Sequence, residues 1–373
     1  MRKKYLVTGI ILGGILFSIL IIILTIKKSG GEMEELQYRE ASFYQSLGEG
    51  MVQCELCPNR CLLKEGQRGI CKARENIKGK LYSLVYGQVT ITAVDPIEKK
   101  PLYHFLPGAK AYSLSTSGCN LSCKYCQNWD IAQRQPEEVD SKEMTPEEVV
   151  DDALKSGSPV IAFTYNEPVV WFEYMLDIAK LAKQKGLRTV MISNGYINEG
   201  PLKELLGYLD AVKVDLKSFD DNIYQEMTTA KLAPVLETIK TVHDSGQWLE
   251  IVYLVVPDYT DDFEKIKEMC SWIKDNVGEN VPVHFSRFWP KYKLINLPPT
   301  PEEVVKKARE ICQKEGLKYV YTGNIEDEAG NNTYCPQTQN PVIKREGFFI
   351  KENLVDELGK ASNCSATISG VWQ

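Results

Sequence analysis

Three cysteines stand close together in the sequence at C-x3-C-x2-C spacing: Cys119, Cys123 and Cys126. A [4Fe–4S] cluster has four irons and usually takes four cysteine thiolates, so three ligands leave one iron open to bind a substrate or cosubstrate. Three buried or zinc-binding cysteines are the alternative, but zinc sites usually combine two short spacings and fill four positions. The spacing therefore predicts an iron–sulfur cluster with one reactive iron.

A second set of four cysteines precedes the first and begins with a C-x2-C pair: Cys54, Cys57, Cys61 and Cys71. Gly66 and Gly69 lie between the last two and favour a turn of the chain. Four thiolates fill a tetrahedral centre, which predicts structural zinc or, as the alternative, a second iron–sulfur cluster acting at most as an electron relay. Buried cysteines that pack as small hydrophobes are the alternative without a metal.

The elements that position these cysteines follow from alternating strand-like and helix-like segments after Ala111. Such alternation is typical of βαβ units with a parallel sheet. We expect strands over 112–115, 160–164, 189–193, 211–216, 249–256, 281–287 and 319–322. Two Thr-Pro-Glu-Glu sequences predict helix starts with Thr145 and Thr300 as N-caps. The pattern favours an α/β fold with a partial TIM-type (β/α)6 barrel over a doubly wound sheet, since a Gly-rich dinucleotide fingerprint is absent.

Polar side chains end or follow four of the predicted strands, where a barrel binds its ligand. The groups are Asn166 and Glu167, Ser193 and Asn194, Asp215 and Lys217, and His284. Carboxylates, amides and a cation suit a ligand with an amino-acid end, a ribose and a base. Each group alone is weak evidence for a ligand site. Asp215 and Lys217 also fit a solvated ion pair, and His284 also fits a histidine of the core.

Four longer motifs narrow the interpretation: Asp-Pro-Ile-Glu-Lys-Lys-Pro-Leu-Tyr-His from Asp95, the cysteine loop ending in Cys-Gln-Asn-Trp129, Ala-Phe-Thr-Tyr-Asn-Glu-Pro from Ala162, and Tyr-Val-Tyr-Thr-Gly-Asn from Tyr319. With them the chain resembles the radical S-adenosylmethionine (SAM) enzyme of the AmmeMemoRadiSam system, a relative of the pyruvate formate-lyase activating enzymes. The resemblance covers roughly residues 54–324. It departs at Thr229-Ala230, where that family has a glycine pair, and in the C-terminal region, where Cys335 and Cys364 are what remains of two C-x2-C knuckles.

The resemblance implies a [4Fe–4S] cluster at Cys119, Cys123 and Cys126 and SAM chelated by its open iron. Reductive cleavage of SAM would give a 5′-deoxyadenosyl radical that abstracts hydrogen from a substrate left unidentified. Contacts to SAM are expected from Tyr125, Asn166, Glu167, Ser193, Asn194, Asp215, Lys217 and His284. Activation of a glycyl radical enzyme is the alternative within this class, and a non-catalytic iron–sulfur electron carrier or a scaffold is the alternative outside it.

The partners follow from the same reasoning. Memo-like and AMMECR-like proteins are candidates by resemblance, and we expect a low-potential flavodoxin- or ferredoxin-type electron donor. The net charge is −6, with basic and acidic residues interspersed, so nucleic acid is not expected to bind.

The N-terminus predicts a membrane anchor. The run from Tyr5 to Ile26 is uncharged, mostly Ile and Leu, and long enough to cross a hydrocarbon layer of about 30 Å. A cleaved signal peptide would have a shorter apolar core and a small-residue cleavage site. The flanking basic residues are nearly balanced and do not orient the span. Free thiols and a low-potential cluster favour the cytoplasmic side for the catalytic domain.

The 373 residues therefore divide into five predicted parts. These are a single-pass transmembrane anchor (1–28), a linker (29–50), a Cys-rich N-terminal segment (51–108), a radical SAM core (109–325) and a C-terminal extension (326–373).

Overall fold

The computed structural model describes residues 38–373, which form a single compact unit from Arg39 onward. The predicted span from Tyr5 to Ile26 and the first part of the predicted linker lie outside the described residues. In residues 38–373, no helix is both long and apolar enough to cross a bilayer.

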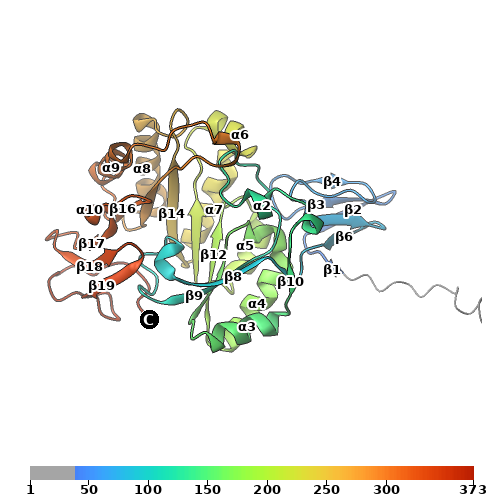
Figure 1. Cartoon of the computed structure of the whole chain (residues 1–373), viewed down its shortest axis with the longest axis horizontal. Coiled ribbons are helices and arrows are strands. Elements are labelled where there is room, and N and C mark those ends of the chain that lie inside the picture. The colour runs from blue at the N-terminus through green and yellow to red at the C-terminus, as the bar shows by residue number, and fades with distance from the viewer. Residues whose placement is uncertain (1–37) are drawn as a thin grey trace, which may run out of the picture. The chain divides into compact units, whose positions relative to one another are not determined.

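The centre of the fold is one sheet of eight strands in the order β16-β15-β14-β13-β12-β11-β9-β8 (Figure 1). Seven strands are parallel, and β8 pairs antiparallel with β9. The bounds are β8 (Ile91–Pro96), β9 (Lys110–Ser115), β11 (Val160–Phe163), β12 (Arg188–Ser193), β13 (Ala211–Asp215), β14 (Trp248–Val255), β15 (Val283–Arg287) and β16 (Val320–Gly323). All seven predicted strands are thus confirmed as parallel neighbours. The sheet is open, because β8 and β16 are its two edges.

Helices connect the parallel strands and cover the sheet (Figure 1). They are α3 (Pro146–Lys155), α4 (Phe172–Gln184), α5 (Glu199–Leu206), α6 (Asp221–Thr228), α7 (Leu232–Asp244), α8 (Phe263–Val277) and α9 (Glu302–Lys314). In α7 the buried residues Val235, Thr238, Ile239 and Val242 recur at helical spacing and form one face. The strands are buried on both sides, as in β11, where every residue of Val-Ile-Ala-Phe is buried.

The two Thr-Pro-Glu-Glu sequences have different roles in the structure. Thr145 caps α3 in a capping box: its hydroxyl accepts from the Glu148 N–H at 3.2 Å, and the Glu148 carboxylate accepts from the Thr145 N–H at 2.8 Å. The prediction for Thr300 is wrong. Pro301 is the N-cap of α9, and the Thr300 hydroxyl instead donates to the Val255 carbonyl at 2.6 Å.

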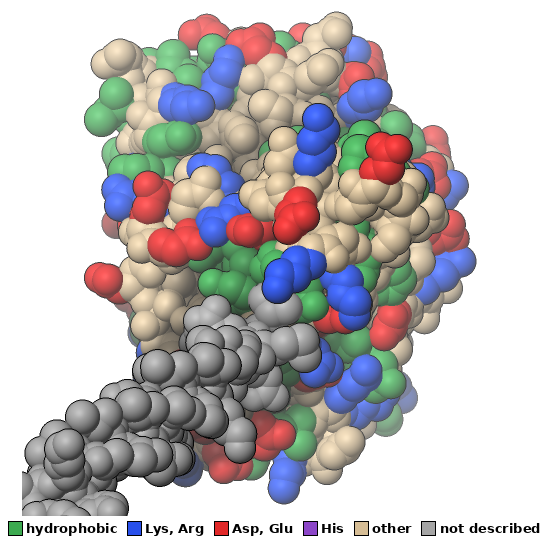
Figure 2. All heavy atoms as spheres, turned by 90° about the vertical axis from the view of Figure 1, so that its right-hand side faces the viewer, with side chains coloured by type: hydrophobic (Ala, Val, Ile, Leu, Met, Phe, Trp, Pro, Cys, Tyr) green, Lys and Arg blue, Asp and Glu red, His purple; other side chains and the backbone are tan. Residues whose placement is uncertain are grey.

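The N-terminal region consists of short strands in small antiparallel sheets beside the central sheet (Figure 1). They are β1 (Arg39–Glu40), β2 (Tyr44–Gly48), β3 (Met51–Cys54), β4 (Leu62–Leu63), β5 (Arg74–Ile77), β6 (Lys80–Ser83), β7 (Gln88–Val89) and β10 (Lys142–Glu143). The predicted linker is too long, because residues 39–50 form β1 and β2 and pair with β6 and β3. Lysine, arginine, aspartate and glutamate are mixed over the face seen in Figure 2.

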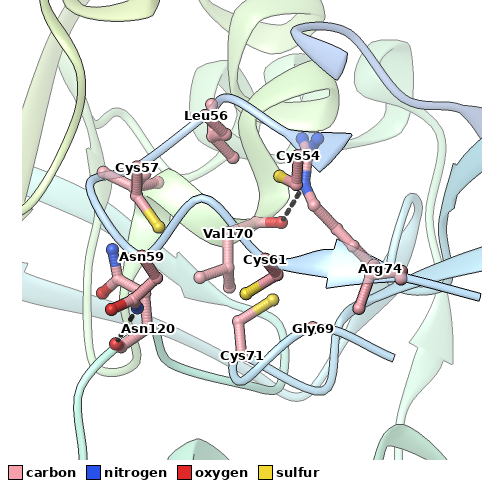
Figure 3. A pocket seen from close by; sticks show the side chains of 12 residues that line it. Cys54, Leu56, Cys57, Asn59, Cys61, Gly69, Cys71, Arg74, Asn120 and Val170 are labelled. Carbon is pink, nitrogen blue, oxygen red and sulfur yellow. Dashed lines mark hydrogen bonds between the residues drawn. The ribbon is translucent and has the colours of Figure 1, made fainter. Parts of the chain in front are cut away.

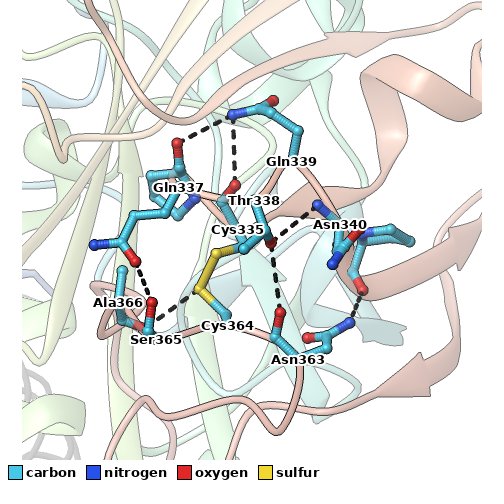
Figure 4. The surroundings of a disulfide bond; sticks show 11 residues. Cys335, Gln337, Thr338, Gln339, Asn340, Asn363, Cys364, Ser365 and Ala366 are labelled. Carbon is cyan, nitrogen blue, oxygen red and sulfur yellow. Dashed lines mark hydrogen bonds between the residues drawn. A yellow bond between two sulfur atoms is a disulfide. The ribbon is translucent and has the colours of Figure 1, made fainter.

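The C-terminal extension adds a helix and a three-stranded antiparallel sheet. The elements are α10 (Glu328–Asn331), β17 (Thr333–Tyr334), β18 (Pro341–Glu346) and β19 (Phe349–Asn353); a further short helix, α2 (Trp129–Ala132), follows the cysteine loop. The two cysteines left from the predicted knuckles form a disulfide, Cys335–Cys364 (Figure 4). A second disulfide, Cys270–Cys312, joins α8 to α9. The seven other cysteines are free, and they are the two predicted sets.

Candidate active site

The cysteine loop leaves β9 at the carboxyl end of the sheet and is fixed by backbone hydrogen bonds. The Gly118 N–H donates to the Ile131 carbonyl at 2.9 Å. Further along, the Ser122 and Lys124 N–H groups donate to carbonyls at the end of α6, each at 2.9 Å. These bonds hold the segment that carries Cys119, Cys123 and Cys126 over the ends of β9 and β13.

Cys123 is buried and Cys119 and Cys126 are half-buried, and burial raises the pKa of all three thiols. The pKa of Cys123 rises to about 12, and that of Cys119 lies well above its usual value. Binding to a metal displaces such a proton, because the thiolate is the ligand. In residues 38–373, no three histidine, cysteine, aspartate or glutamate side chains are gathered closely enough to hold a single metal ion. This finding applies to both cysteine sets, so binding of a cluster or of an ion needs rotation of the cysteine side chains.

Glu167 follows β11 and connects the next strand to the cysteine loop. Its carboxylate accepts hydrogen bonds from the Ser193 hydroxyl at 2.7 Å and the Asn194 N–H at 2.8 Å. The Asn194 side-chain amide lies 3.8 Å from the Cys119 sulfur as a donor and also donates to the Asn120 side-chain oxygen at 2.8 Å. Burial raises the pKa of Glu167 to about 7 against the effect of these donors. A carboxyl group poised near neutrality therefore lies next to the first cysteine.

Asp215 ends β13 between two lysines. Lys213 donates to one of its carboxylate oxygens, and Lys217 donates to the other at 2.9 Å. Burial alone would raise the pKa of Asp215, but the two lysines outweigh it and lower the pKa to about 2. The Lys217 ammonium lies 6.0 Å from the centre of the Tyr125 ring, in the cysteine loop. This second polar group is therefore charged and lies beside Cys123 and Tyr125.

The Tyr125 hydroxyl group is buried and has no hydrogen-bond partner among the described residues. An unpaired buried hydroxyl costs free energy, and groups of this kind commonly face a ligand or water. Together with three thiols, Glu167 and the Asp215–Lys217 pair, it makes a donor set that fits a thiolate-bound cluster and a charged organic ligand.

Asn166 has a structural role that the sequence did not indicate. Its amide nitrogen donates to the Gly118 carbonyl at 3.0 Å, and its oxygen accepts from the Trp171 indole at 3.2 Å. It thus fixes the start of the cysteine loop, and contact with SAM stays a prediction. The preceding residue, Tyr165, has φ of 69°, and its carbonyl accepts from the Asn128 side chain at 2.6 Å. Tyr165 therefore adopts a left-handed backbone conformation just before Asn166 and Glu167.

His284 lies level with Asp215 across the sheet, because Val252 in β14 pairs with both residues. Its Nε2 is 2.7 Å from the Glu250 carboxylate, and its ring packs against Tyr103 and Tyr321. These contacts also fit the alternative of a core histidine, and contact of His284 with SAM stays a prediction.

Asn120 is the main site residue that the sequence reasoning missed. It joins three segments: its side chain contacts Asn194 and donates to the Tyr196 carbonyl at 2.7 Å, while its own carbonyl accepts from the Asn59 side chain at 2.8 Å. Its place directly after Cys119 was the only signal, because the partners come from distant parts of the chain.

The second cysteine set lines one small cavity on the other side of Asn120 (Figure 3). Burial raises the pKa of Cys57 and of Cys71 to about 12. Cys54 ends β3, Cys57 and Cys61 lie in the loop between β3 and β4, and Cys71 lies in the turn before β5. The fold therefore places the four cysteines around one cavity.

Comparison with known proteins identifies related sequences. A family model described as the radical SAM superfamily matches residues 113–270. An uncharacterised protein of Methanocaldococcus jannaschii is 45% identical over 331 residues, which cover 88% of this chain and 98% of that protein. The pyruvate formate-lyase-activating enzyme of Clostridium pasteurianum is 32% identical over 194 residues, covering 48% of this chain and 77% of the enzyme. The crystal structure of a domain of pyruvate-formate lyase-activating enzyme from Bacteroides vulgatus aligns with a TM-score of 0.39 and 19% identity over 44% of this chain and 98% of that domain.

The chain belongs to the radical SAM superfamily. It is a radical SAM enzyme, homologous to the pyruvate formate-lyase activating enzymes, and the cofactors of this class are a [4Fe–4S] cluster and SAM.

Proposed function

We propose that this chain cleaves SAM reductively at a [4Fe–4S] cluster held by Cys119, Cys123 and Cys126. The observation that carries the proposal is the placement of Glu167 and the Asp215–Lys217 pair on either side of this loop, joined to it through Asn194 and Tyr125. A cluster with one open iron supplies the electron for cleavage and the position at which SAM binds.

The residues around the loop bind and orient the cosubstrate. Glu167, when ionised, attracts the ammonium of the methionyl part of SAM, because it is an anion in a buried site. Lys217 and Asp215 offer a cation and a carboxylate for its carboxylate and ribose groups. Tyr125 contributes an aromatic face and a free hydroxyl. Asn120 and Asn166 position the loop through the bonds described above.

The test compares two lysines in one region. Lys217→Ala should weaken SAM binding while leaving iron and sulfide content unchanged, because Lys217 faces Cys123 without being a ligand. Lys124→Ala is the control, since Lys124 belongs to the same loop but pairs with Glu226 at 2.8 Å on the surface. The readout is the change that SAM induces in the EPR spectrum of the reduced cluster. Loss of iron in Lys217→Ala, or equal SAM titrations for both variants, would contradict the assignment.

We further propose that the chain is the radical SAM enzyme of an AmmeMemoRadiSam system. The motifs from Asp95, Cys119, Ala162 and Tyr319 support this, and Memo-like and AMMECR-like proteins are its proposed partners. A flavodoxin- or ferredoxin-type protein would supply the electron. Co-elution of the purified chain with either partner protein checks the association, and independent elution of both would contradict it.

A second candidate function is activation of a glycyl radical enzyme by hydrogen abstraction from a glycine backbone. The homology to the Clostridium pasteurianum activating enzyme favours it. An organic radical on a partner enzyme, detected by EPR after incubation with the chain and SAM, would establish this function over the first.

The proposed localisation is a single-pass anchor with the catalytic domain on the cytoplasmic side. The apolar run from Tyr5 to Ile26 and the seven free thiols support it. The two disulfides count against a reducing compartment, although some intracellular proteins of hyperthermophiles also carry them.

A further inference from the structure

The second cysteine set surrounds a partly open cavity of about 20 Å³, which has room for a small species such as one metal ion. Figure 3 shows the sulfurs of Cys57, Cys61 and Cys71 turned toward the space between them. The other side chains of the walls are Leu56, Leu63, Val169 and Val170, together with Asn59, Asn120 and the buried Arg74. A small cavity lined by four thiols suits a single soft metal ion.

Two of the sulfurs lie against one glycine. A β-carbon at Gly69 would lie 3.6 Å from the sulfur of Cys61 and 3.6 Å from that of Cys71, so these two sulfurs share one side of the cavity. Backbone bonds fix the turn: the Gly69 N–H donates to the Arg74 carbonyl at 2.9 Å, and the Cys54 N–H donates to the Cys61 carbonyl at 2.9 Å. The turn therefore brings Cys61 and Cys71 to one side of the cavity.

Disulfide formation does not account for the grouping of Cys54, Cys57, Cys61 and Cys71. Four other cysteines of the chain are paired in disulfides, whereas all four here are free. Free thiols that line one cavity, in a protein that forms disulfides elsewhere, are in the state that a metal ion requires.

We propose that Cys54, Cys57, Cys61 and Cys71 bind one zinc ion in a tetrahedral four-thiolate centre. The sulfurs surround the cavity but are not yet gathered to the bond length of about 2.3 Å that zinc requires. A cysteine side chain turns about a single bond, so binding needs rotation of these side chains and no change of the fold. Four filled positions leave none open, and the centre is structural.

The position of the centre gives it a specific role. The Cys71 carbonyl packs against Gly118, where a β-carbon would lie 2.5 Å from its oxygen. Asn59, which lines the cavity, donates to the Asn120 carbonyl in the cluster loop at 2.8 Å. Both contacts join the zinc-binding segment to the residues on either side of Cys119. The ion therefore positions the loop that carries the catalytic cysteines.

The experiment uses the full chain with Cys119, Cys123 and Cys126 all replaced by alanine, so that its result does not depend on the proposed SAM chemistry. This variant, purified from medium containing zinc and iron, should hold one zinc per chain, measured by elemental analysis. Adding Cys57→Ser should remove the zinc, whereas Cys335→Ser with Cys364→Ser is the control and should retain it. Absence of metal, or iron with sulfide in place of zinc, would overturn the proposal.

A second measurement does not depend on the folding of the Cys57 variant. Cobalt(II) added to the metal-free triple-alanine protein should give the visible absorption of tetrahedral cobalt with thiolate charge transfer. A spectrum of octahedral cobalt without charge-transfer bands would equally overturn the four-thiolate centre.

Discussion

Glu167 receives hydrogen bonds from three donors and is buried, and these two features act on its pKa in opposite directions. The backbone N–H groups of Asn194 and Val169 and the Ser193 hydroxyl favour the ionised carboxylate. Burial favours the neutral acid and dominates, so the pKa is raised to about 7. The charge available to attract an ammonium group therefore changes near physiological pH.

This predicts that SAM binds more weakly as the pH falls below about 7. A carboxyl group with a raised pKa is protonated on the acid side of that pKa, and only its anionic form attracts the ammonium of SAM. The dissociation constant should rise by up to roughly tenfold per pH unit in that range. Glu167→Gln should bind weakly with little pH dependence, as measured by equilibrium dialysis with labelled SAM. Parallel pH profiles for the wild type and Glu167→Gln would contradict this role.

At the scale of elements, the predicted positions of the site residues hold where the sequence marks the end of a strand clearly. Glu167, Ser193, Asn194 and Asp215 were placed at strand ends, and the structure has them there because buried apolar runs mark β11, β12 and β13 clearly. The segment predicted from residue 281 begins at Val283 instead, and the register sets His284 level with Asp215 through Val252.

Local sequence signals failed where distant partners decide the structure. Thr300 matches a capping sequence as well as Thr145 does, but the Val255 carbonyl, which is 45 residues away, takes its hydroxyl. Residues 39–50 were predicted as part of a polar linker because the segment from Ser29 to Gly50 has a Gly-Gly pair, several glutamates and few branched apolar residues, yet strands β1 and β2 in it pair with β6 and β3. The contacts of Asn120 and the cavity of the second cysteine set likewise depend on tertiary packing.

Gly118 tests how tightly the two cysteine segments are joined. It has φ of 93°, and a β-carbon there would lie 2.5 Å from the Cys71 carbonyl oxygen. Gly118→Ala should therefore lower the free energy of unfolding by more than the roughly 1–2 kcal/mol of backbone strain alone, and it should reduce iron loading. Gly157→Ala is the matched control, because Gly157 has φ of 67° and no atoms within 4 Å of a β-carbon.

Urea unfolding and iron analysis of both variants give the comparison. Equal losses of stability with full iron content in both would mean that the contact between Gly118 and Cys71 does not hold the loop.

At the scale of the whole molecule, the open sheet carries an N-terminal region at the cluster loop and a C-terminal sheet that a disulfide closes. The segment from 97 to 106 joins the central sheet to the C-terminal extension. The Tyr103 and His104 N–H groups donate to the Glu250 carboxylate in β14 at 3.0 and 2.8 Å. The Leu106 N–H donates to the Val371 carbonyl at 2.7 Å. The described unit begins at Arg39, so the proposed anchor precedes a domain that folds around its own core.

Deletion of residues 1–31 should accordingly release the protein from the membrane fraction without loss of iron. The proposed span lies wholly in the deleted part, whereas both cysteine sets lie beyond it. Fractionation of cells that express the two forms, followed by iron analysis, measures the effect. A truncated form that stays with the membranes would contradict the anchor.

The most direct test of the central claim is the formation of 5′-deoxyadenosine. Anaerobically reconstituted protein, given a reductant and SAM, should form this product, and Cys123→Ala should abolish it because the cluster loses a ligand. Cys335→Ser with Cys364→Ser is the control and should retain activity, since that disulfide lies in the C-terminal extension. Product formation by Cys123→Ala at the rate of the wild type, or none by the iron-loaded wild type, would contradict the claim.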